Sequence, residues 1–361
     1  MLRDLTIQNY RSFKEFRIDG LSRVNLIVGM NNSGKTSLLE AVYLLANQND
    51  PARLGEILEN RGELGLPRSS NVRSTYQISQ LFNGRQFASK DAIRISSQHD
   101  RPLSFQITIQ LTTQPDERSS AKQMPIFEES DEGTEPLPLL ELLFDYGAET
   151  VMKAPLRDDG SLDSRAFRLF SRETHPSQFL TTNNLDYSDL ADLWDSVHLT
   201  AEEDKVVAAL QTLDPRVERI GFTSRQTTNS GIRLKLQGQQ DPVPLGSMGD
   251  GMRRILTLTT AEIASEDGVL LVDEIDTGLY YRAQKDMWHL LIQTARRLNV
   301  QVFATTHSLD CVRAFQEALS VEEDKEIGKL FRLNMRGGNI RPVAYAAHDL
   351  EIAMQQEIEV R

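Results

Sequence analysis

The stretch Gly29-Met30-Asn31-Asn32-Ser33-Gly34-Lys35-Thr36 has the residue types and the spacing of a phosphate-binding loop. In the pattern G-x-x-x-x-G-K-[ST], the backbone N–H groups of a tight loop and the N-terminus of the next helix form a concave site for phosphate oxygens. The lysine reaches the β- and γ-phosphates, and the threonine hydroxyl can ligate Mg²⁺. We therefore predict a nucleoside triphosphate site made of Gly29, Asn31, Asn32, Ser33, Gly34, Lys35, Thr36 and Ser37.

The residues on either side of this loop fit the strand–loop–helix setting that the motif requires. Val24 to Val28 is an apolar run, which predicts a strand. Beyond the loop, apolar residues recur at helical spacing and predict a helix from Gly34 to about Gln48. A second helix is expected over Ala52 to Asn60.

A second apolar run, Val269 to Val272, ends in the acids Asp273 and Glu274. This pattern is typical of a buried parallel strand that delivers carboxylates to its C-terminal edge. Asp273 would support Mg²⁺, and Glu274 would orient or deprotonate the attacking water. For the two acids alone the alternative is an ordinary strand-to-turn junction, but the phosphate loop earlier in the chain favours the catalytic interpretation.

A third predicted strand, Val300 to Ala304, ends in the polar residues Thr305, Thr306, His307 and Ser308. His307 stands where it could contact a γ-phosphate, and the two threonines can form hydrogen bonds there. The remaining histidines are interpreted as structural: His99, His175, His198, His289 and His348.

A glycine-rich loop, Leu245 to Arg254, precedes an amphipathic helix. Such a loop at a helix N-terminus is another anion-binding arrangement, although a plain turn with a helix cap is the alternative. The chain thus has two loops suited to phosphate but only one phosphate-loop lysine. We expect the second loop to complete the nucleotide site of another subunit.

The predicted elements indicate an α/β fold: a P-loop NTPase with a mixed central sheet, an antiparallel β subdomain and a small inserted helical lobe. Alternating apolar residues between Ala92 and Ala154 predict the antiparallel strands. We expect an N-terminal part of the ATPase head over 1–160, the inserted lobe over 161–228, and the C-terminal part of the head over 229–361.

The composition is that of an ordinary soluble protein, with 39% hydrophobic and 25% charged residues among 361. No apolar run approaches the ~18 residues of a membrane span, and the N-terminus lacks the apolar core of a signal peptide, so we expect a cytoplasmic protein without membrane contact. The single cysteine, Cys311, excludes an internal disulfide and a multi-cysteine zinc site.

The net charge of −12 argues against a surface that binds nucleic acid over its whole extent. A local basic bias between Gly65 and Arg101 could still form a patch, although a solvated face is the alternative. Its basic residues are Arg68, Arg73, Arg85, Lys90, Arg94 and Arg101.

The order of these motifs resembles the ABC-type ATPase heads of SMC, RecF and OLD-family proteins. The opening segment Ile7-Gln8-Asn9-Tyr10-Arg11-Ser12-Phe13 looks most like the stand-alone ATPases of the OLD type. The resemblance covers about 1–60 and 231–361.

In that family two heads enclose two ATP molecules, so the resemblance implies an ATP-dependent homodimer. It implies that Lys35 and Thr36 bind phosphate and Mg²⁺, that Asp273 supports Mg²⁺, that Glu274 is the catalytic base, and that His307 is the switch histidine. In addition, Ser247 and Gly249 match the signature loop that contacts the opposite subunit's γ-phosphate, and Asp276 matches the D-loop aspartate at the dimer interface.

The sequence also departs from the family pattern. The signature reads Ser247-Met248-Gly249-Asp250-Gly251, which fits the OLD and RecF side better than membrane transporters. For the family's Q-loop glutamine, Gln98 is the residue we consider. OLD nucleases carry a Toprim domain after the ATPase, and because only a short segment follows His307, we expect no such nuclease domain in this chain.

We therefore expect an ATP-dependent dimeric switch that hydrolyses ATP with Mg²⁺ and controls a separate effector. The OLD resemblance suggests a Toprim-type nuclease as that effector and anti-phage defence in bacteria as the setting. The competing hypothesis is a RecF-like clamp that closes on duplex DNA during recombination or repair. A transporter ATPase subunit is disfavoured by the altered signature.

Overall fold

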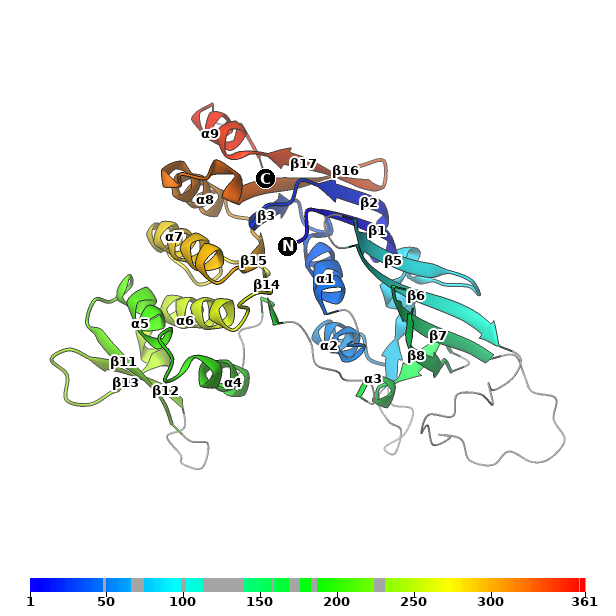
Figure 1. The fold of residues 1–361 in the computed structure, drawn as a ribbon, viewed down its shortest axis with the longest axis horizontal. Coiled ribbons are helices and arrows are strands. Elements are labelled where there is room, and N and C mark those ends of the chain that lie inside the picture. Colours follow the sequence, from blue (N-terminus) through cyan, green and yellow to red (C-terminus); the bar gives the residue numbers. More distant parts are fainter. Residues whose placement is uncertain are drawn as a thin grey trace.

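The computed structural model describes residues 1–47, 50–65, 75–98, 102–112, 139–147, 149–157, 159–168, 176–182, 187–223, 231–356 and 358–360. Figure 1 shows helices gathered on one side of a central sheet and a second sheet on the other side. The long helix α1 (Lys35–Ala46) lies between the two sheets.

The central sheet has six strands in the order β10-β14-β15-β3-β16-β17. The first five are parallel, and β17 runs antiparallel to β16. Because the carboxyl ends of parallel strands meet at one edge, the segments after β3, β14 and β15 lie together, as the sequence patterns predict. The bounds are β10 Ser177–Leu180, β14 Val269–Val272, β15 Gln301–Thr305, β3 Val24–Gly29, β16 Gly328–Arg336 and β17 Asn339–Tyr345.

The inner strands β14, β15 and β3 are buried on both faces, which explains why they are almost continuously apolar. In β3, Leu26 and Val28 belong to one hydrophobic core, whereas Ile27 belongs to the other. Strand β15 alternates in the same way, with Ala304 in the first core and Phe303 in the second. The site therefore stands on strands fixed from both sides.

The second sheet has the order β2-β1-β5-β6-β7-β8, and all of its neighbouring strands are antiparallel, as expected for the β subdomain. It covers α1 together with α2 (Ala52–Asn60), whose predicted bounds are confirmed. The strands are β1 Asp4–Tyr10, β2 Phe13–Asp19, β5 Ala92–Ser97, β6 Leu103–Thr112, β7 Leu139–Tyr146 and β8 Glu149–Pro155. A small pair joins β4 Thr75–Gln77 to β9 Ser161–Asp163, and α3 spans Arg165–Arg168.

The opposite face of the central sheet is covered by helices that Figure 1 shows in a row from α6 to α9. They are α6 Asp250–Ile263, α7 Tyr281–Arg297, α8 Leu309–Val321 and α9 Ala347–Gln355. Beside α6 in that view lies α5 (Glu203–Gln211), and below them lie α4 (Tyr187–Val197) and a three-stranded sheet. That sheet consists of β11 Val217–Thr223, β12 Gly231–Leu236 and β13 Val243–Pro244.

The segment 161–228, expected as an inserted helical lobe, contains α4 and α5. It also supplies β10 to the central sheet and β11 to a sheet whose other strands follow residue 228. The boundaries at 160 and 228 therefore stay a prediction, and the strand pairings show how closely this segment is built into the rest of the chain.

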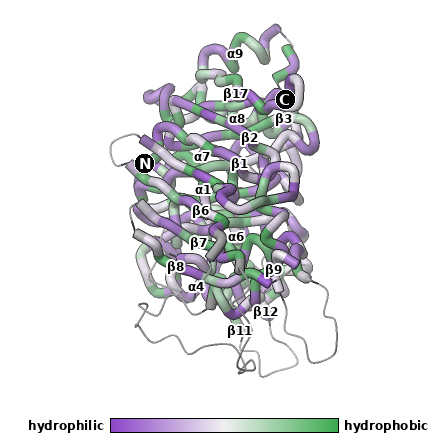
Figure 2. Tube along the Cα trace, turned by 90° about the vertical axis from the view of Figure 1, so that its right-hand side faces the viewer, coloured by the Kyte–Doolittle hydropathy of each residue, from purple (hydrophilic) through white to green (hydrophobic). Residues whose placement is uncertain are grey.

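Hydrophilic and hydrophobic residues are interspersed along the chain trace (Figure 2). Within the described residues, no helix combines the length and the apolar character that crossing a membrane requires.

Candidate active site

The loop after β3 has a backbone that depends on its two glycines. Gly29 and Gly34 have φ angles of 150° and 91°, which L side chains rarely adopt. A Cβ atom on Gly29 would lie 2.7 Å from the Ser33 hydroxyl oxygen, and one on Gly34 would lie 2.9 Å from Phe13 Cζ. The motif is therefore glycine at both positions for steric reasons.

The residues between these glycines line a cradle suited to an anion. Asn31 and Asn32 are exposed, and Asn32 also has a positive φ of 60°. Ser33 is only 2% exposed, and its hydroxyl oxygen finds no hydrogen-bond partner within the part of the chain that the structure describes. An orphaned buried hydroxyl beside glycine backbone and a helix N-terminus fits a phosphate group.

The Lys35 ammonium lies across this loop. Its Nζ donates to the carbonyl oxygens of Gly29 (2.9 Å) and Met30 (3.0 Å). Burial lowers the pKa of Lys35, and the carboxylates of Asp273 and Glu274 oppose that shift. The ammonium is thus held beside the position that phosphate oxygens would take.

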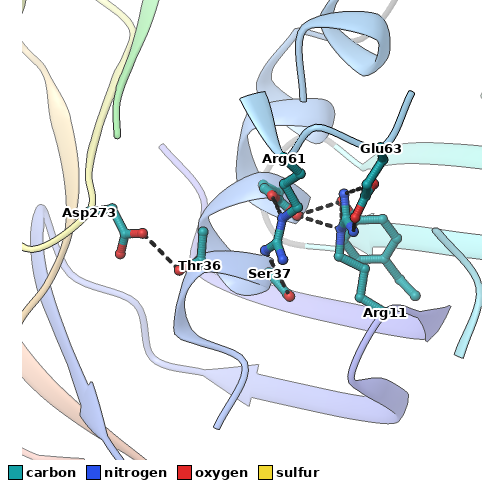
Figure 3. Close-up of polar contacts among 8 residues, drawn as sticks. Arg11, Thr36, Ser37, Arg61, Glu63 and Asp273 are labelled. Atoms are coloured by element: carbon teal, nitrogen blue, oxygen red, sulfur yellow. Dashed lines mark hydrogen bonds and ion pairs between the residues drawn. The ribbon is translucent and has the colours of Figure 1, made fainter. Parts of the chain in front are cut away.

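Thr36 and Asp273 meet although 237 positions separate them in the sequence. The Thr36 hydroxyl donates to Asp273 Oδ2 at 2.7 Å, across the gap between α1 and the end of β14 (Figure 3). The second carboxylate oxygen, Oδ1, accepts a 2.5 Å bond from the buried Thr305 hydroxyl at the end of β15. Three parallel strands therefore bring the phosphate loop and the acidic segment to one point.

The oxygen atoms of Thr36 and Asp273 fit Mg²⁺, which prefers hard oxygen ligands. No group of three or more His, Cys, Asp or Glu residues that could hold a metal occurs in the described ranges. Two protein oxygens with phosphate and water as the remaining ligands is the arrangement that Mg²⁺ commonly takes with nucleotides.

Glu274 follows Asp273 in an unusual backbone conformation. Its φ is 47°, in the left-handed region that a non-glycine residue enters only when neighbours hold it there. Its N–H donates to the Thr305 hydroxyl oxygen at 2.9 Å, and its carboxylate accepts a long 3.5 Å bond from the Thr277 hydroxyl. The backbone therefore turns sharply at Glu274, directly after Asp273.

Asp276 and His307 lie at the same edge of the sheet. The Thr306 hydroxyl donates to Asp276 Oδ1 at 2.6 Å and accepts from the Ser308 N–H at 2.9 Å. His307 lies between Thr306 and Ser308 in the sequence, two residues after the end of β15, and is exposed. The structure thus joins the loops after β14 and β15 through Thr306.

The signature loop lies at the start of α6. Ser247 and Gly249 are exposed, and Gly249, with a φ of 88°, caps the start of α6. The next residue, Asp250, packs against Gly278 beyond Asp276. Among the hydrogen bonds of the described residues, none joins this loop to residues 29–37.

A buried charge network supports α1 from behind (Figure 3). Arg11 Nε lies 2.6 Å from Glu40 Oε2, and its two terminal nitrogens donate to Glu63 at 2.7 and 3.1 Å. Arg61 Nε donates to Glu40 Oε1 at 2.5 Å and Arg61 Nη2 reaches the Ser37 hydroxyl at 3.5 Å. This network fixes the side of α1 that faces away from Asp273.

The structure contradicts the assignment of Gln98 to the Q-loop. The Gln98 N–H donates to Asp4 at the start of β1, next to Leu2, whose N–H donates to Gln301. Gln301 is the first residue of β15, so this is the end of the parallel strands opposite to Asp273. Spacing alone could not show which strand end Gln98 would reach.

The sequence interpretation also missed a strand end beside the acids. Strand β10 pairs with β14, and the Asp273 N–H donates to the carbonyl of Leu180, the last residue of β10. Thr181 and Thr182 follow directly and belong to the same edge of the sheet. The available signal was a four-residue strand, which is too short for periodicity to identify.

The basic bias after Gly65 is only partly described. Arg85 and Lys90 are exposed, and Arg94 Nε donates to Gln106 at 2.8 Å. The other three basic residues, Arg68, Arg73 and Arg101, lie outside the described residues.

Comparison with known protein families finds a match over most of the chain. A family model described as "AAA domain, putative AbiEii toxin, Type IV TA system" matches residues 24–310. That range begins with β3 and ends at the start of α8, so it includes the phosphate loop, the signature loop and the acidic segment. It covers well over half of the chain.

Two relatives are similar over almost their whole length. The chain is 24% identical over 381 residues to an ATP/GTP phosphatase of Helicobacter pylori, with 99% of each protein covered. It is 25% identical over 369 residues to the DNA replication and repair protein RecF of Streptococcus pneumoniae, with 89% of this chain and 96% of that protein covered. Among solved structures, an SMC head bound to the C-terminal winged-helix domain of ScpA is 15% identical, with a TM-score of 0.49 and coverage of 98% and 99%.

Proposed function

This chain belongs to the AAA-domain family, and we propose that it is an ATPase switch of the RecF-like kind, which dimerises around ATP and controls a separate effector. The family match and the two full-length relatives support the ATPase assignment. The narrower OLD subtype remains an expectation from the sequence motifs.

One observation carries the proposal: the hydrogen bond between Thr36 and Asp273. It joins the residue after the phosphate-loop lysine to the acid after β14, from opposite ends of the sequence. A plain turn at Gly29–Thr36 would not require a carboxylate beside the Thr36 hydroxyl. Thr305 holds the other oxygen of the same carboxylate, so the pair is positioned from two sides.

The residues suggest the following division of labour. The backbone of the loop and the Lys35 ammonium bind the β- and γ-phosphates. Thr36 and Asp273 would hold Mg²⁺, which when bound neutralises charge on the transferred phosphoryl group. Glu274 orients the attacking water and accepts its proton, and His307 contacts the γ-phosphate from the end of β15.

Nucleotide hydrolysis by matched variants tests this assignment. We expect phosphate release from ATP by the wild type, with binding abolished in Lys35→Ala. Glu274→Gln should still bind ATP but hydrolyse it at least ~100-fold more slowly, because only the group that activates water is changed. GTP should be assayed beside ATP, since one relative is named an ATP/GTP phosphatase. Hydrolysis by Lys35→Ala at the wild-type rate would disprove the proposed site.

Control of a separate effector is the finer part of the proposal. The signature residues Ser247 and Gly249 support a second subunit, because they are exposed and have no hydrogen bond to the phosphate loop of their own chain among the described residues. A Toprim-type nuclease and a role in anti-phage defence are expectations from the OLD resemblance. Co-purification with the product of a neighbouring reading frame, with and without ATP, tests them: release of a nuclease on hydrolysis supports the switch, and its absence in both states counts against it.

A RecF-like DNA clamp is the second candidate, favoured by the full-length similarity to RecF. Duplex binding would need basic side chains that neutralise phosphates, and binding would weaken steeply with salt. Arg85 and Lys90 are exposed and available for this. ATP-dependent retardation of duplex DNA that is lost in Arg85→Ala/Lys90→Ala, but kept in the exposed control Arg336→Ala, would favour the clamp.

A further inference from the structure

We propose that Arg254 is a positioning residue that couples the signature loop to the catalytic acid Glu274. The inference rests on the proposed function, because it assumes that Glu274 activates water and that the signature loop contacts a nucleotide. It assigns a role to a residue that neither the sequence motifs nor the comparisons single out.

Arg254 lies in the second turn of α6, and its side chain is buried, with the residue only 3% exposed. The guanidinium donates to three successive main-chain carbonyls: from Nη2 to Asp273 (3.2 Å) and Glu274 (2.9 Å), and from Nε to Ile275 (3.4 Å). It therefore holds the backbone of the segment that carries both acids.

A buried guanidinium is costly unless charges compensate it. Burial lowers the pKa of Arg254, and the carboxylates of Asp276, Asp273 and Glu274 oppose this shift. All three acids belong to the segment whose main-chain carbonyls accept hydrogen bonds from Arg254. An apolar side chain would fill this interior at lower cost, so an arginine here indicates a specific task.

The role of Arg254 follows from the backbone conformation of Glu274. Its φ of 47° is unfavourable for a side chain and requires support from neighbours. Two bonds supply that support: the N–H donates to Thr305 and the carbonyl accepts from Arg254. Thr305 stands on a rigid buried strand, whereas Arg254 stands on the signature helix. Only the second support can move with the signature loop.

The connection from the loop to Arg254 is short and rigid. Gly249 caps α6, and Arg254 follows Asp250 by four residues, about one helical turn. Asp250 also packs against Gly278, beyond the acids on the same segment. A displacement of Ser247 and Gly249 against a nucleotide therefore shifts the guanidinium and, with it, the backbone of Glu274.

In the proposed dimer, the signature loop contacts the nucleotide held by the partner, whereas Glu274 serves the nucleotide held by its own phosphate loop. Arg254 thus makes hydrolysis in one site depend on engagement of the other. This gives the two sites a physical means of acting in concert.

Steady-state kinetics of two Arg254 variants test the coupling. In Arg254→Met we expect kcat to fall about tenfold to a hundredfold with KM for ATP unchanged within about twofold, because the support of the acid is lost and the phosphate loop is intact. Arg254→Lys should recover part of kcat, since an ammonium can donate to fewer of the three carbonyls. Arg297→Met is the control. It removes the ion pair between Glu202 and the last residue of α7, which has no hydrogen bond or ion pair with Asp273 or Glu274 in the described part of the chain, and it should retain wild-type kcat.

Dimerisation separates this inference from the proposed function. Arg254→Met/Glu274→Gln should form an ATP-dependent dimer as readily as Glu274→Gln, measured by light scattering, because only coupling is removed. Wild-type kcat in Arg254→Met, or loss of dimerisation together with kcat, would overturn the inference. If Arg254→Met fails to fold, wild-type kcat in Arg254→Lys would overturn it. A Glu274→Gln protein that stays monomeric with ATP would instead refute the proposed function.

Discussion

Among single residues, Thr305 is the one that links the two acids of the candidate site. Its hydroxyl donates to Asp273 and accepts from the N–H of Glu274, while the side chain is fully buried. From the sequence alone, Thr305 can be assigned only a general hydrogen-bonding role, because a threonine at a strand end has many possible partners. The structure shows that it orients both acids at once.

Thr305→Val should therefore damage the site without changing its shape. Valine has nearly the same volume but cannot form either bond, so we expect kcat for ATP hydrolysis to fall about tenfold to a hundredfold. The free energy of unfolding should fall by about 1–3 kcal/mol, because buried polar groups lose their partner. Thr305→Ser, which keeps the hydroxyl, should retain most of both quantities; equal losses in the serine and valine variants would show that the methyl group matters instead.

Glu262 predicts a pH dependence of stability. It is buried on α6 and its Oε1 has no hydrogen-bond partner among the described residues. Burial raises its pKa well above 4.5, against the opposing charge of Arg297. Above pH 4.5 the unfolded chain loses this proton while the folded chain retains it, so this group's contribution to stability falls as pH rises towards the folded pKa.

Glu262→Gln removes that titration and should become more stable relative to wild type as pH increases. Urea unfolding at pH 5, 6.5 and 8 measures the difference in the free energy of unfolding between the two proteins. We expect the difference to grow in favour of the variant across this series. A difference that is constant with pH would show that Glu262 titrates alike in the folded and unfolded chains.

At the scale of elements, α1 is the component on which the site depends most. It lies between the two sheets, with its N-terminus at the phosphate loop and its outer side on the Arg11–Glu40–Arg61 network. The Arg11 and Glu40 side chains are 6% and 3% exposed, so this is a buried pair. Removing one partner of such a pair leaves an uncompensated charge.

Glu40→Gln should consequently lower the free energy of unfolding by about 3–5 kcal/mol. The matched control is Glu326→Gln, whose carboxylate pairs with Lys329 but is 73% exposed; we expect a change below ~1 kcal/mol there. Chemical denaturation of both variants provides the comparison. Similar small effects in the two would mean that Arg11 is sufficiently compensated by Glu63.

How far the sequence predicts the elements depends on the length of each pattern. The strand–loop–helix around Lys35 and the apolar runs before Asp273 and Thr305 were identified because one face or both faces of each element are uniformly apolar. Strand β10 was missed because four residues give no measurable period. Arg254 was missed because it was expected to end the glycine-rich loop, and only tertiary packing shows that it is a buried residue of α6. The assignment of Gln98 to the Q-loop was wrong because spacing does not show to which end of a sheet a strand leads.

At the scale of the whole molecule, the two phosphate-suited loops of one chain have different surroundings. The phosphate loop is completed within the chain by Asp273, whereas the exposed signature residues Ser247 and Gly249 have no hydrogen bond to it among the described residues. In the proposed dimer, a single chain supplies one catalytic half and one signature half that serve different nucleotides. This predicts that the two halves can be provided by different molecules.

Mixing two inactive variants tests that prediction. Lys35→Ala lacks a functional phosphate loop but keeps its signature loop, and Ser247→Arg keeps its phosphate loop but blocks the signature. Each alone should hydrolyse no ATP. In an equimolar mixture, half of the dimers combine the two chains and contain one intact composite site, so ATPase activity should return to at most about one quarter of the wild-type value per chain. Activity should lie well below that bound, because the intact phosphate loop belongs to the Ser247→Arg chain, whose own signature loop cannot act on Glu274 through Arg254. Absence of both ATPase activity and ATP-dependent mixed dimers in the mixture would mean that the signature acts on the nucleotide of its own chain.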